Sequence, residues 1–331
     1  MCPTSRVRQQ SGPRGRAGFA LPLVLGIILL LVIMALGLSI FSRMRMQQAR
    51  YQMEQARAYY LARRGLVQVE YRLAKLWARN RAREAGADGR WQNLRGVPGQ
   101  VRYRVQDERG KLNINRITPL VLRRVLARLG LGPDRLERAA DSILDWIDRD
   151  GIPRPAGAEE KFYLSLPLPY LPRNSHITSP GELALVRGVG GGLVFGGGEP
   201  ALWSLVTTYS PGRRVDINSA PQAVLACLPG IGPDKAPRLV ERRQRRPYRG
   251  VHEVSSLLGG DRYKEALPWL TVSPGRIYTI VSQATAPGGR RRHTIMAVVR
   301  IPRRGEPTYL FWVDEVPRLW TGGPRSGHAR R

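Results

Sequence analysis

Five carboxylates lie within one short stretch of a chain that is otherwise strongly basic. The stretch runs from residue 145 to residue 160, where a helix-like segment passes into a loop rich in proline and glycine. Its acids are Asp145, Asp148, Asp150, Glu159 and Glu160. Carboxylate oxygens clustered around a loop suit Ca²⁺, although the spacing differs from that of an EF-hand loop. The spacing alone favours the alternative that these acids form a solvated helix end and pair with Arg149 and Arg154.

A second motif, LPGIGPDKAPRLVERRQRRPYRG at residues 228–250, resembles a helix-hairpin-helix element. In DNA-binding versions, a turn such as the one at Gly230 and Gly232 presents backbone N–H groups to a phosphate at the start of a helix. The arginines that would add electrostatic affinity are Arg242, Arg243, Arg245 and Arg246. The alternative is that the turn packs two helices together and that the arginines form a solvated face. The net charge of +29 fits a nucleic-acid or anionic-lipid partner, but also the arginine usage of a GC-rich genome.

Residues suited to catalysis are scattered along the chain. The four histidines show no metal-ligand spacing, and the sequence contains no nucleophile elbow and no phosphate-binding loop. Cys227 lies in an apolar helical context and is expected to be a small core residue. We therefore do not expect an enzyme.

An apolar segment close to the amino terminus predicts a membrane anchor. Residues 1–18 form an acid-free, arginine-bearing leader, and residues 19–42 then run for 24 positions without a charge. As a helix they would be ~36 Å long, enough to cross a hydrocarbon core of ~30 Å. A secretory signal would be cleaved after its apolar run, whereas here the plausible cleavage point, Gly18–Phe19, precedes it. Arginines flank both ends of the segment, so charge alone does not fix its orientation.

The remaining pattern predicts an α+β fold in which a long helix packs on an antiparallel sheet. Leu66, Val69, Leu73 and Leu76 form one apolar stripe of a helix that continues the anchor to residue 79. Strands are expected near residues 100–108, 276–284, 293–301 and 308–316. We expect the sheet to comprise segments 80–108 and 271–316, interrupted by a helical insertion at 109–270 and followed by a disordered tail at 317–331.

The insertion contains a weak internal repeat. Residues 110–131 and 214–232 each combine a short strand-like piece, an asparagine and a proline that begins a helix. Candidate N-caps are Asn115 or Thr118 in the first copy, and Asn218 or Ser219 in the second. Two related helical lobes are therefore expected.

Five features in the correct order are similar to the general secretion pathway protein K family of type II secretion minor pseudopilins. The amino-terminal leader, ending in Gly18 before Phe19, and the apolar helix resemble those of prepilins. Leu23 stands at the fifth mature position, where most pilins have glutamate and K-type subunits lack it. The other four features are DERGKLNIN at 107–115, DWIDRDGIPRPAGAEEKFYLS at 145–165, SPGEL at 179–183 and VDINSAPQAVLACLPG at 215–230.

This resemblance implies a pseudopilin scaffold with an inserted helical domain, at the tip of a short periplasmic filament. Such a subunit initiates filament assembly and aids export of folded proteins across the outer membrane. The implied partners are the I and J minor pseudopilins, the inner membrane and a prepilin peptidase that cleaves after Gly18 and methylates Phe19. The chain would be a single-pass protein with its carboxyl-terminal domain in the periplasm.

The same resemblance bears on the two motifs. It favours calcium binding by the acidic loop, and it treats the helix-hairpin-helix element as structural, so that nucleic acid is not expected as a partner. The alternative function is a membrane-anchored, helix-hairpin-helix DNA-binding protein of a competence system.

Overall fold

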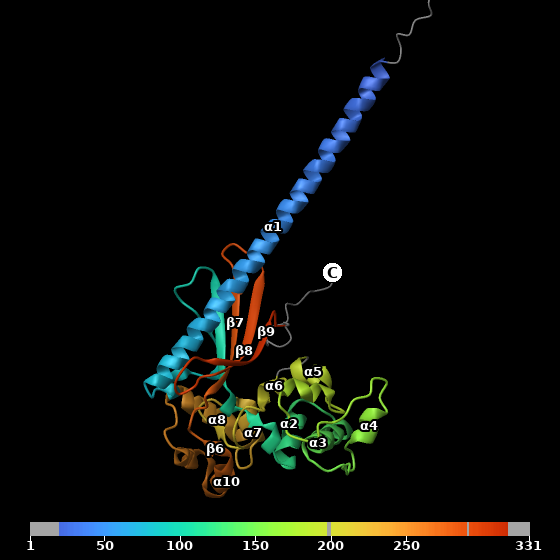
Figure 1. Ribbon diagram of the computed structural model, residues 1–331. Coiled ribbons are helices and arrows are strands. Elements are labelled where there is room, and N and C mark those ends of the chain that lie inside the picture. Colours follow the sequence, from blue (N-terminus) through green and yellow to red (C-terminus); the bar gives the residue numbers. More distant parts are fainter. Residues whose placement is uncertain (1–19, 197–199, 290, 317–331) are drawn as a thin grey trace, which may run out of the picture. The chain divides into compact units, whose positions relative to one another are not determined.

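The computed structural model describes residues 20–196, 200–289 and 291–316 (Figure 1). The expected leader at 1–18, Phe19 and the expected tail at 317–331 lie outside the described residues. The chain divides into two compact units, Met1–Ala56 and Arg57–Arg331.

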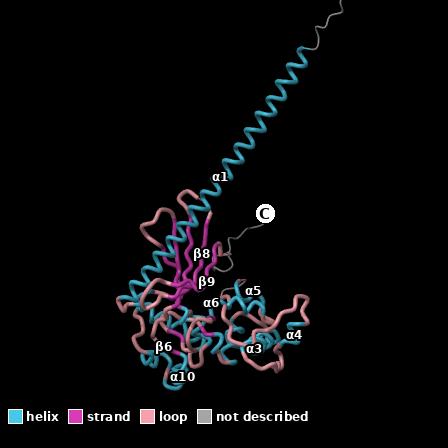
Figure 2. Tube along the Cα trace, viewed as in Figure 1, coloured by secondary structure: helices cyan, strands magenta, loops and turns pink. Residues whose placement is uncertain are grey.

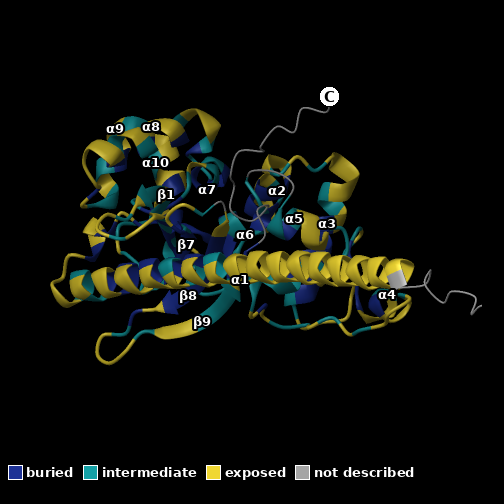
Figure 3. Ribbon diagram, turned by 90° about the horizontal axis from the view of Figure 1, so that it is seen from above, coloured by how far each residue is buried: buried dark blue, intermediate teal, exposed yellow. Residues whose placement is uncertain are grey.

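The described part of the first unit belongs to helix α1 (Ala20–Ala78), which is 59 residues long and ends in the second unit. From Leu21 to Met53 its side chains are exposed (Figure 3). The mean hydropathy of its most apolar window is 3.1, and by length and composition the helix can cross a membrane. Both the apolar segment and the amphipathic segment of the sequence therefore lie in one unbroken helix.

The second unit is built on a five-stranded antiparallel sheet in the order β1-β2-β7-β8-β9. Its strands are β1 (Asp88–Asn93), β2 (Gln100–Asp107), β7 (Ile277–Thr285), β8 (Arg292–Arg300) and β9 (Thr308–Asp314). The first two strands precede the insertion and the last three follow it. The predicted α+β fold is confirmed, although β1 was not among the expected strands.

The part of α1 that belongs to the second unit lies on one face of this sheet. Leu66, Val69 and Leu73 are buried against apolar side chains of β2, β7 and β8. Gly65 permits the helix backbone to approach β7 closely, because a Cβ atom at this position would lie 2.5 Å from the hydroxyl of Ser282. The predicted helical stripe therefore forms the core of the scaffold.

The insertion consists of two lobes with a common apolar core, and loops make up much of it (Figure 2). The first lobe contains β3 (Leu112–Asn113), α2 (Pro119–Arg128), α3 (Pro133–Ile147), α4 (Glu160–Leu164), α5 (Gly190–Phe195), α6 (Leu202–Leu205) and β4 (Val206–Thr207). The second contains β5 (Val215–Asp216), α7 (Gln222–Cys227), α8 (Gly232–Arg245), α9 (Ser255–Leu258), α10 (Gly260–Ala266) and β6 (Leu270–Thr271). Short 3₁₀ turns are η1 (Ala82–Ala85), η2 (Glu108–Gly110), η3 (Ile114–Arg116), η4 (Pro180–Leu185), η5 (Val251–Val254) and η6 (Leu267–Trp269). In each lobe the first short strand pairs in parallel with the last.

The sequence repeat corresponds to a repeated contact between an asparagine side chain and a distant loop. Asn115 accepts a hydrogen bond from the Ile177 N–H at 2.8 Å and donates to the Ile177 carbonyl at 2.9 Å. Asn218 makes the same two bonds with Tyr248, at 2.8 and 2.9 Å. Neither asparagine is an N-cap: Thr118 holds that position in α2 without a side-chain bond, and a proline holds it in α7. Both asparagines join distant parts of their lobes instead.

Candidate metal centre

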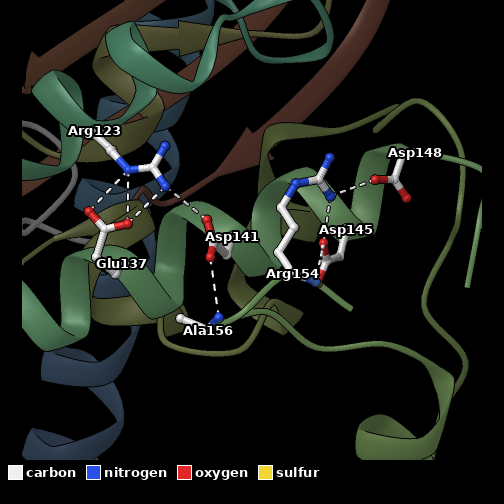
Figure 4. A network of polar contacts seen from close by, with 7 residues as sticks. All are labelled: Arg123, Glu137, Asp141, Asp145, Asp148, Arg154 and Ala156. Atoms are coloured by element: carbon white, nitrogen blue, oxygen red, sulfur yellow. Dashed lines mark hydrogen bonds and ion pairs between the residues drawn. The ribbon is translucent and has the colours of Figure 1, made fainter. Parts of the chain in front are cut away.

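Helix α3 presents a row of acidic side chains along the face that meets the loop at residues 151–158. Its opposite face carries Ala139, Ala140, Ile143 and Trp146, which are buried in the core of the insertion. The acidic row consists of Glu137, Asp141, Asp145 and, at the C-cap, Asp148. Spacings of four, four and three residues place these carboxylates on one side of the helix (Figure 4).

Asp145 anchors the loop to the helix. Its side chain is fully buried, and Arg154 Nη1 lies 2.5 Å from Asp145 Oδ1. The backbone N–H of Arg154 donates to Asp145 Oδ2 at 3.2 Å. Gly157 leaves room for this carboxylate, because a Cβ atom there would lie 1.8 Å from Oδ2. Burial raises the pKa of Asp145 above its ordinary value, and the hydrogen bonds from Arg154 oppose this shift.

The other loop contact comes from the preceding turn of α3. Asp141 accepts a hydrogen bond from the backbone N–H of Ala156 at 3.2 Å. Its second oxygen lies 3.0 Å from Arg123 Nη2, and the same guanidinium also binds Glu137 (Figure 4). The loop is therefore fastened to α3 at two carboxylates before it reaches Glu159.

Three carboxylates meet beside this loop, and we refer to Asp148, Asp150 and Glu159 as the acidic triad. One oxygen from each lies within 4.8 Å of the others. Among the described residues, neither oxygen of Glu159 has a hydrogen-bond partner, although the residue is only 5% exposed. The Oδ1 atom of Asp148 is likewise buried and without a partner there. Burial, followed by the negative charge of Asp145, raises the pKa of Glu159. The nearby side chain of Asn174 opposes this shift, and the charges of Asp148 and Asp150 add to it.

The structure adds one polar residue to the site that the sequence did not indicate. Asn174 has a left-handed backbone with φ of 46°. Its side-chain Nδ2 donates to the carbonyl of Asp150 at 3.4 Å, and its Oδ1 is buried without a partner among the described residues. Asparagine tolerates left-handed backbone better than most residues do, but this preference gives no clue to a partner 24 positions away.

The structure therefore brings together three of the five predicted ligands. Asp145 is engaged by Arg154, and Glu160 is an exposed residue at the start of α4. The donor set combines buried oxygens of Asp148, Glu159 and Asn174 that have no partner among the described residues with the exposed carboxylate of Asp150. One oxygen of Asp150 accepts a hydrogen bond from the backbone N–H of Ile152 at 3.0 Å. Such a set fits Ca²⁺ better than a metal that prefers thiolate or imidazole ligands.

The turn at Gly230 and Gly232 packs against helix α10. Both glycines have left-handed φ values, of 72° and 69°. A Cβ atom on Gly230 would lie 2.1 Å from the backbone oxygen of Arg262, so α10 covers this side of the turn. Asp234, in the first turn of α8, forms an ion pair with Arg262 at 2.7 Å. In a DNA-binding helix-hairpin-helix element, the first turn of this helix would bind a phosphate. Here the carboxylate of Asp234 lies in that turn instead.

The arginines of α8 are divided between internal contacts and the surface. Arg243 is buried and donates to two backbone carbonyls in front of α7, at 2.7 and 2.5 Å. Arg242 forms an ion pair with Glu253, whereas Arg245 and Arg246 are exposed. This arrangement fits a structural hairpin.

Comparison with known proteins gives consistent matches. Two family models described as "Type II secretion system (T2SS), protein K" match residues 93–194 and 215–273. The type II secretion system protein K of Pseudomonas aeruginosa is 24% identical over 318 residues, which cover 88% of this chain and 91% of that protein. The proteins of the same name from Pectobacterium carotovorum and Dickeya chrysanthemi are 33% identical over 106 residues and 28% identical over 149 residues. These two matches cover 28% and 42% of this chain, and 32% and 38% of the relatives.

A solved structure has the same fold. It is a chain of the GspK-GspI-GspJ complex from the type 2 secretion system of enterotoxigenic Escherichia coli. The TM-score is 0.56 at 19% identity, and the match covers 81% of this chain and 99% of the other. The comparisons do not support the DNA-binding alternative.

Proposed function

The chain belongs to the type II secretion system protein K family and is a minor pseudopilin, and we propose that it forms the tip of a periplasmic pseudopilus. The observation that carries this proposal is the lack of a carboxylate in the apolar part of α1. Leu23 stands at the fifth position after the expected cleavage site, and the first acid of the helix is Glu54. A subunit with no carboxylate there cannot neutralise the amino terminus of a subunit above it, which suits the end of a filament.

In this role the chain initiates assembly of the pseudopilus and aids the export of folded proteins across the outer membrane. The apolar half of α1 spans the inner membrane once, and the sheet and insertion lie in the periplasm. The chain acts structurally and is a substrate of the prepilin peptidase rather than an enzyme. Cleavage between Gly18 and Phe19 and methylation of Phe19 are part of the proposal and rest on the sequence resemblance.

We propose the I and J minor pseudopilins as partners, because the solved neighbour is a complex of such proteins. The test is co-expression of the full-length chain with its host's I and J subunits, followed by affinity purification in detergent and light scattering. A complex of defined stoichiometry is expected, and the major pseudopilin of the same host is the matched control. Recovery of the chain without either minor subunit would contradict this assignment.

We further propose that the acidic triad and Asn174 bind Ca²⁺. The support is the set of buried oxygens of Asp148, Glu159 and Asn174 that have no partner in the described part of the chain, an arrangement that burial would otherwise penalise. A bound calcium ion supplies positive charge to carboxylates that repel one another, while Asp145 and Asp141 hold the loop in position. A ligand at ~100 times its Kd stabilises the folded state by ~2.7 kcal/mol. An extracellular-type site, with Kd of ~10⁻⁴ to 10⁻³ M, needs millimolar calcium for even part of this effect.

The calcium proposal is tested by thermal melting in EDTA, in calcium and in magnesium at matched ionic strength. We expect a calcium-specific rise in Tm that is lost in Glu159→Gln, whose side chain is buried in the site. Glu160→Gln, an exposed neighbour outside the triad, should keep the rise. Equal melting of the native chain under all three conditions would show that the acids form no calcium site.

A further inference from the structure

One arginine connects Asp145, the helix residue that anchors the loop, with the acidic triad. Arg154 Nη1 lies 2.5 Å from Asp145 Oδ1 and 2.6 Å from Asp148 Oδ2 (Figure 4). A single nitrogen atom thus bridges a buried carboxylate and a triad carboxylate. The Arg154 side chain is 37% exposed, whereas that of Asp145 is 0% exposed. The guanidinium therefore reaches the two acids from the solvent side of the loop.

The charges around this contact are unbalanced. Asp145 and the acidic triad place four carboxylates close together, because one nitrogen atom contacts both Asp145 and Asp148 and one oxygen from each triad residue lies within 4.8 Å of the others. In the part of the chain that the structure describes, the ion pairs to these acids come from Arg154. The single positive charge of Arg154 thus compensates only part of the negative charge of the four carboxylates. The proposed ligand, Ca²⁺, would supply two positive charges.

We infer that Arg154 is a resident counter-ion of the calcium site, which keeps the loop folded without the metal and lowers the affinity of the site for it. This inference rests on the proposed calcium binding. Arg154 already occupies one oxygen of Asp148, and its positive charge lies beside the position that a cation would share with that carboxylate. The site is consequently suited to calcium at high, extracellular-type concentrations, and the chain does not depend on the metal to fold.

Replacement of Arg154 by glutamine separates this role from a purely structural one. Glutamine can still donate a hydrogen bond but carries no charge. A unit positive charge within a few ångströms of a divalent cation weakens its binding roughly tenfold even at water-like screening. Arg154→Gln should therefore bind calcium roughly tenfold more tightly than the native chain. It should also melt at a lower temperature in EDTA, because the buried Asp145 loses its counter-charge.

Two further variants act as controls. Arg154→Lys keeps the charge, and since one nitrogen makes both native contacts, an ammonium group can replace it. This variant should retain native calcium affinity and most of the native Tm in EDTA. Arg149→Gln removes a charge from an exposed side chain of the same segment and should change the affinity much less.

The experiment is calorimetric titration of Ca²⁺ into the full-length chain and each variant in detergent, with melting curves in EDTA, calcium and magnesium. Tighter calcium binding in Arg154→Gln, with native affinity in Arg154→Lys, supports the inference. Equal or weaker binding in Arg154→Gln, while the native chain binds calcium, overturns the inference and leaves the calcium proposal standing. Binding by Arg154→Gln alone would support the inference and contradict calcium binding by the native chain. An absence of calcium binding in every variant overturns both.

Discussion

Raising the pH from 5 to 8 should weaken the folded state, mainly through one buried carboxylate, Asp107. This residue ends β2, where the chain leaves the sheet for the insertion. Its oxygens accept hydrogen bonds from the N–H groups of Arg109, at 2.8 Å, and Gly275, at 2.7 Å. Gly275 lies just before β7, so one carboxylate joins the segments that enter and leave the insertion. A side chain at Gly275 would displace it, because a Cβ atom there would lie 2.4 Å from Asp107 Oδ1.

Complete burial, together with the negative charge of Asp216, raises the pKa of Asp107 from 3.8 to about 8. Burial also raises the pKa of Asp216, to about 6. Between pH 4 and pH 8 the folded chain therefore retains a proton on Asp107 that the unfolded chain has lost. The stability that this proton contributes is fully present below pH 4 and disappears as the pH rises through 8.

The size of the effect follows from proton linkage. One proton held only by the folded state changes the free energy of unfolding by ~1.4 kcal/mol per pH unit. Between pH 6.5 and 7.5 Asp216 is largely ionised, so that the slope in this window belongs mainly to Asp107. Over the three units from pH 5 to pH 8 the loss amounts to ~4 kcal/mol at most.

The assay is urea unfolding of a fragment that begins at Arg57, the first residue of the second compact unit. Tryptophan fluorescence reports unfolding, and EDTA removes any contribution from calcium. The native fragment should lose stability with pH more steeply than Asp107→Asn, which has no proton to release. Asp261→Asn, at a side chain that is 99% exposed, is the matched control and should keep the native slope. Equal slopes in the native and Asp107→Asn fragments would show that the two N–H donors keep Asp107 ionised despite its burial.

Three shorter predictions concern packing in the same fragment. Gly230→Ala should lower the free energy of unfolding by about 2–4 kcal/mol, because left-handed backbone and the adjacent α10 backbone both exclude a side chain. Gly212→Ala, with open space around it, should be close to neutral in the same urea titration, and equal effects would contradict the packing of the hairpin. Leu66→Ala should cost about 2–5 kcal/mol. Val67→Ala, which is 49% exposed on the same helix, should cost less than about 0.5 kcal/mol, and a reversed order of melting temperatures would contradict the helix orientation. Burial raises the pKa of Cys227 to about 11, so a thiol reagent at pH 8 should label it only in urea; rapid labelling of the folded fragment would show that the thiol is accessible.

The sequence predicted the scaffold because its signals are local and periodic. The apolar stripe of α1 and the alternation along β2 each specify one buried face. The central strands β7 and β8 are buried along nearly their whole length, and their runs of β-branched and apolar residues indicate this. Strand β1 was not predicted, because its sequence, DGRWQN, has a single large apolar residue. The strand pairs at the edge of the sheet, where an alternating apolar pattern is not required. Of the candidate N-caps, Thr118 holds that position, whereas Asn115, Asn218 and Ser219 do not. The partners of Asn115 and Asn218 lie 62 and 30 positions away. Nothing in the local sequence encodes such a pairing.

The candidate site shows the same limit. Composition and spacing located the five acids, yet they could not separate Asp145 from the acidic triad. Asp145 differs from the triad because it forms an ion pair with Arg154 and because Gly157, which has no side chain, leaves room for its carboxylate beneath the loop. Asn174 joins the site from a loop that only the folded chain brings near. Metal-site prediction from this sequence therefore finds the region but not the ligand set.

The amino terminus of the mature chain offers the most direct test of the assignment as a pseudopilin. Intact-mass and peptide mass spectrometry of the chain, isolated from membranes of cells that contain a prepilin peptidase, determines it. The expected chain begins at Phe19 and carries a methyl group on its amino nitrogen. Gly18→Ala should slow this processing while membrane insertion continues, and Gly15→Ala, three residues upstream, should be processed normally. A native chain that still begins at Met1, or that is cleaved beyond the apolar segment, would contradict the account.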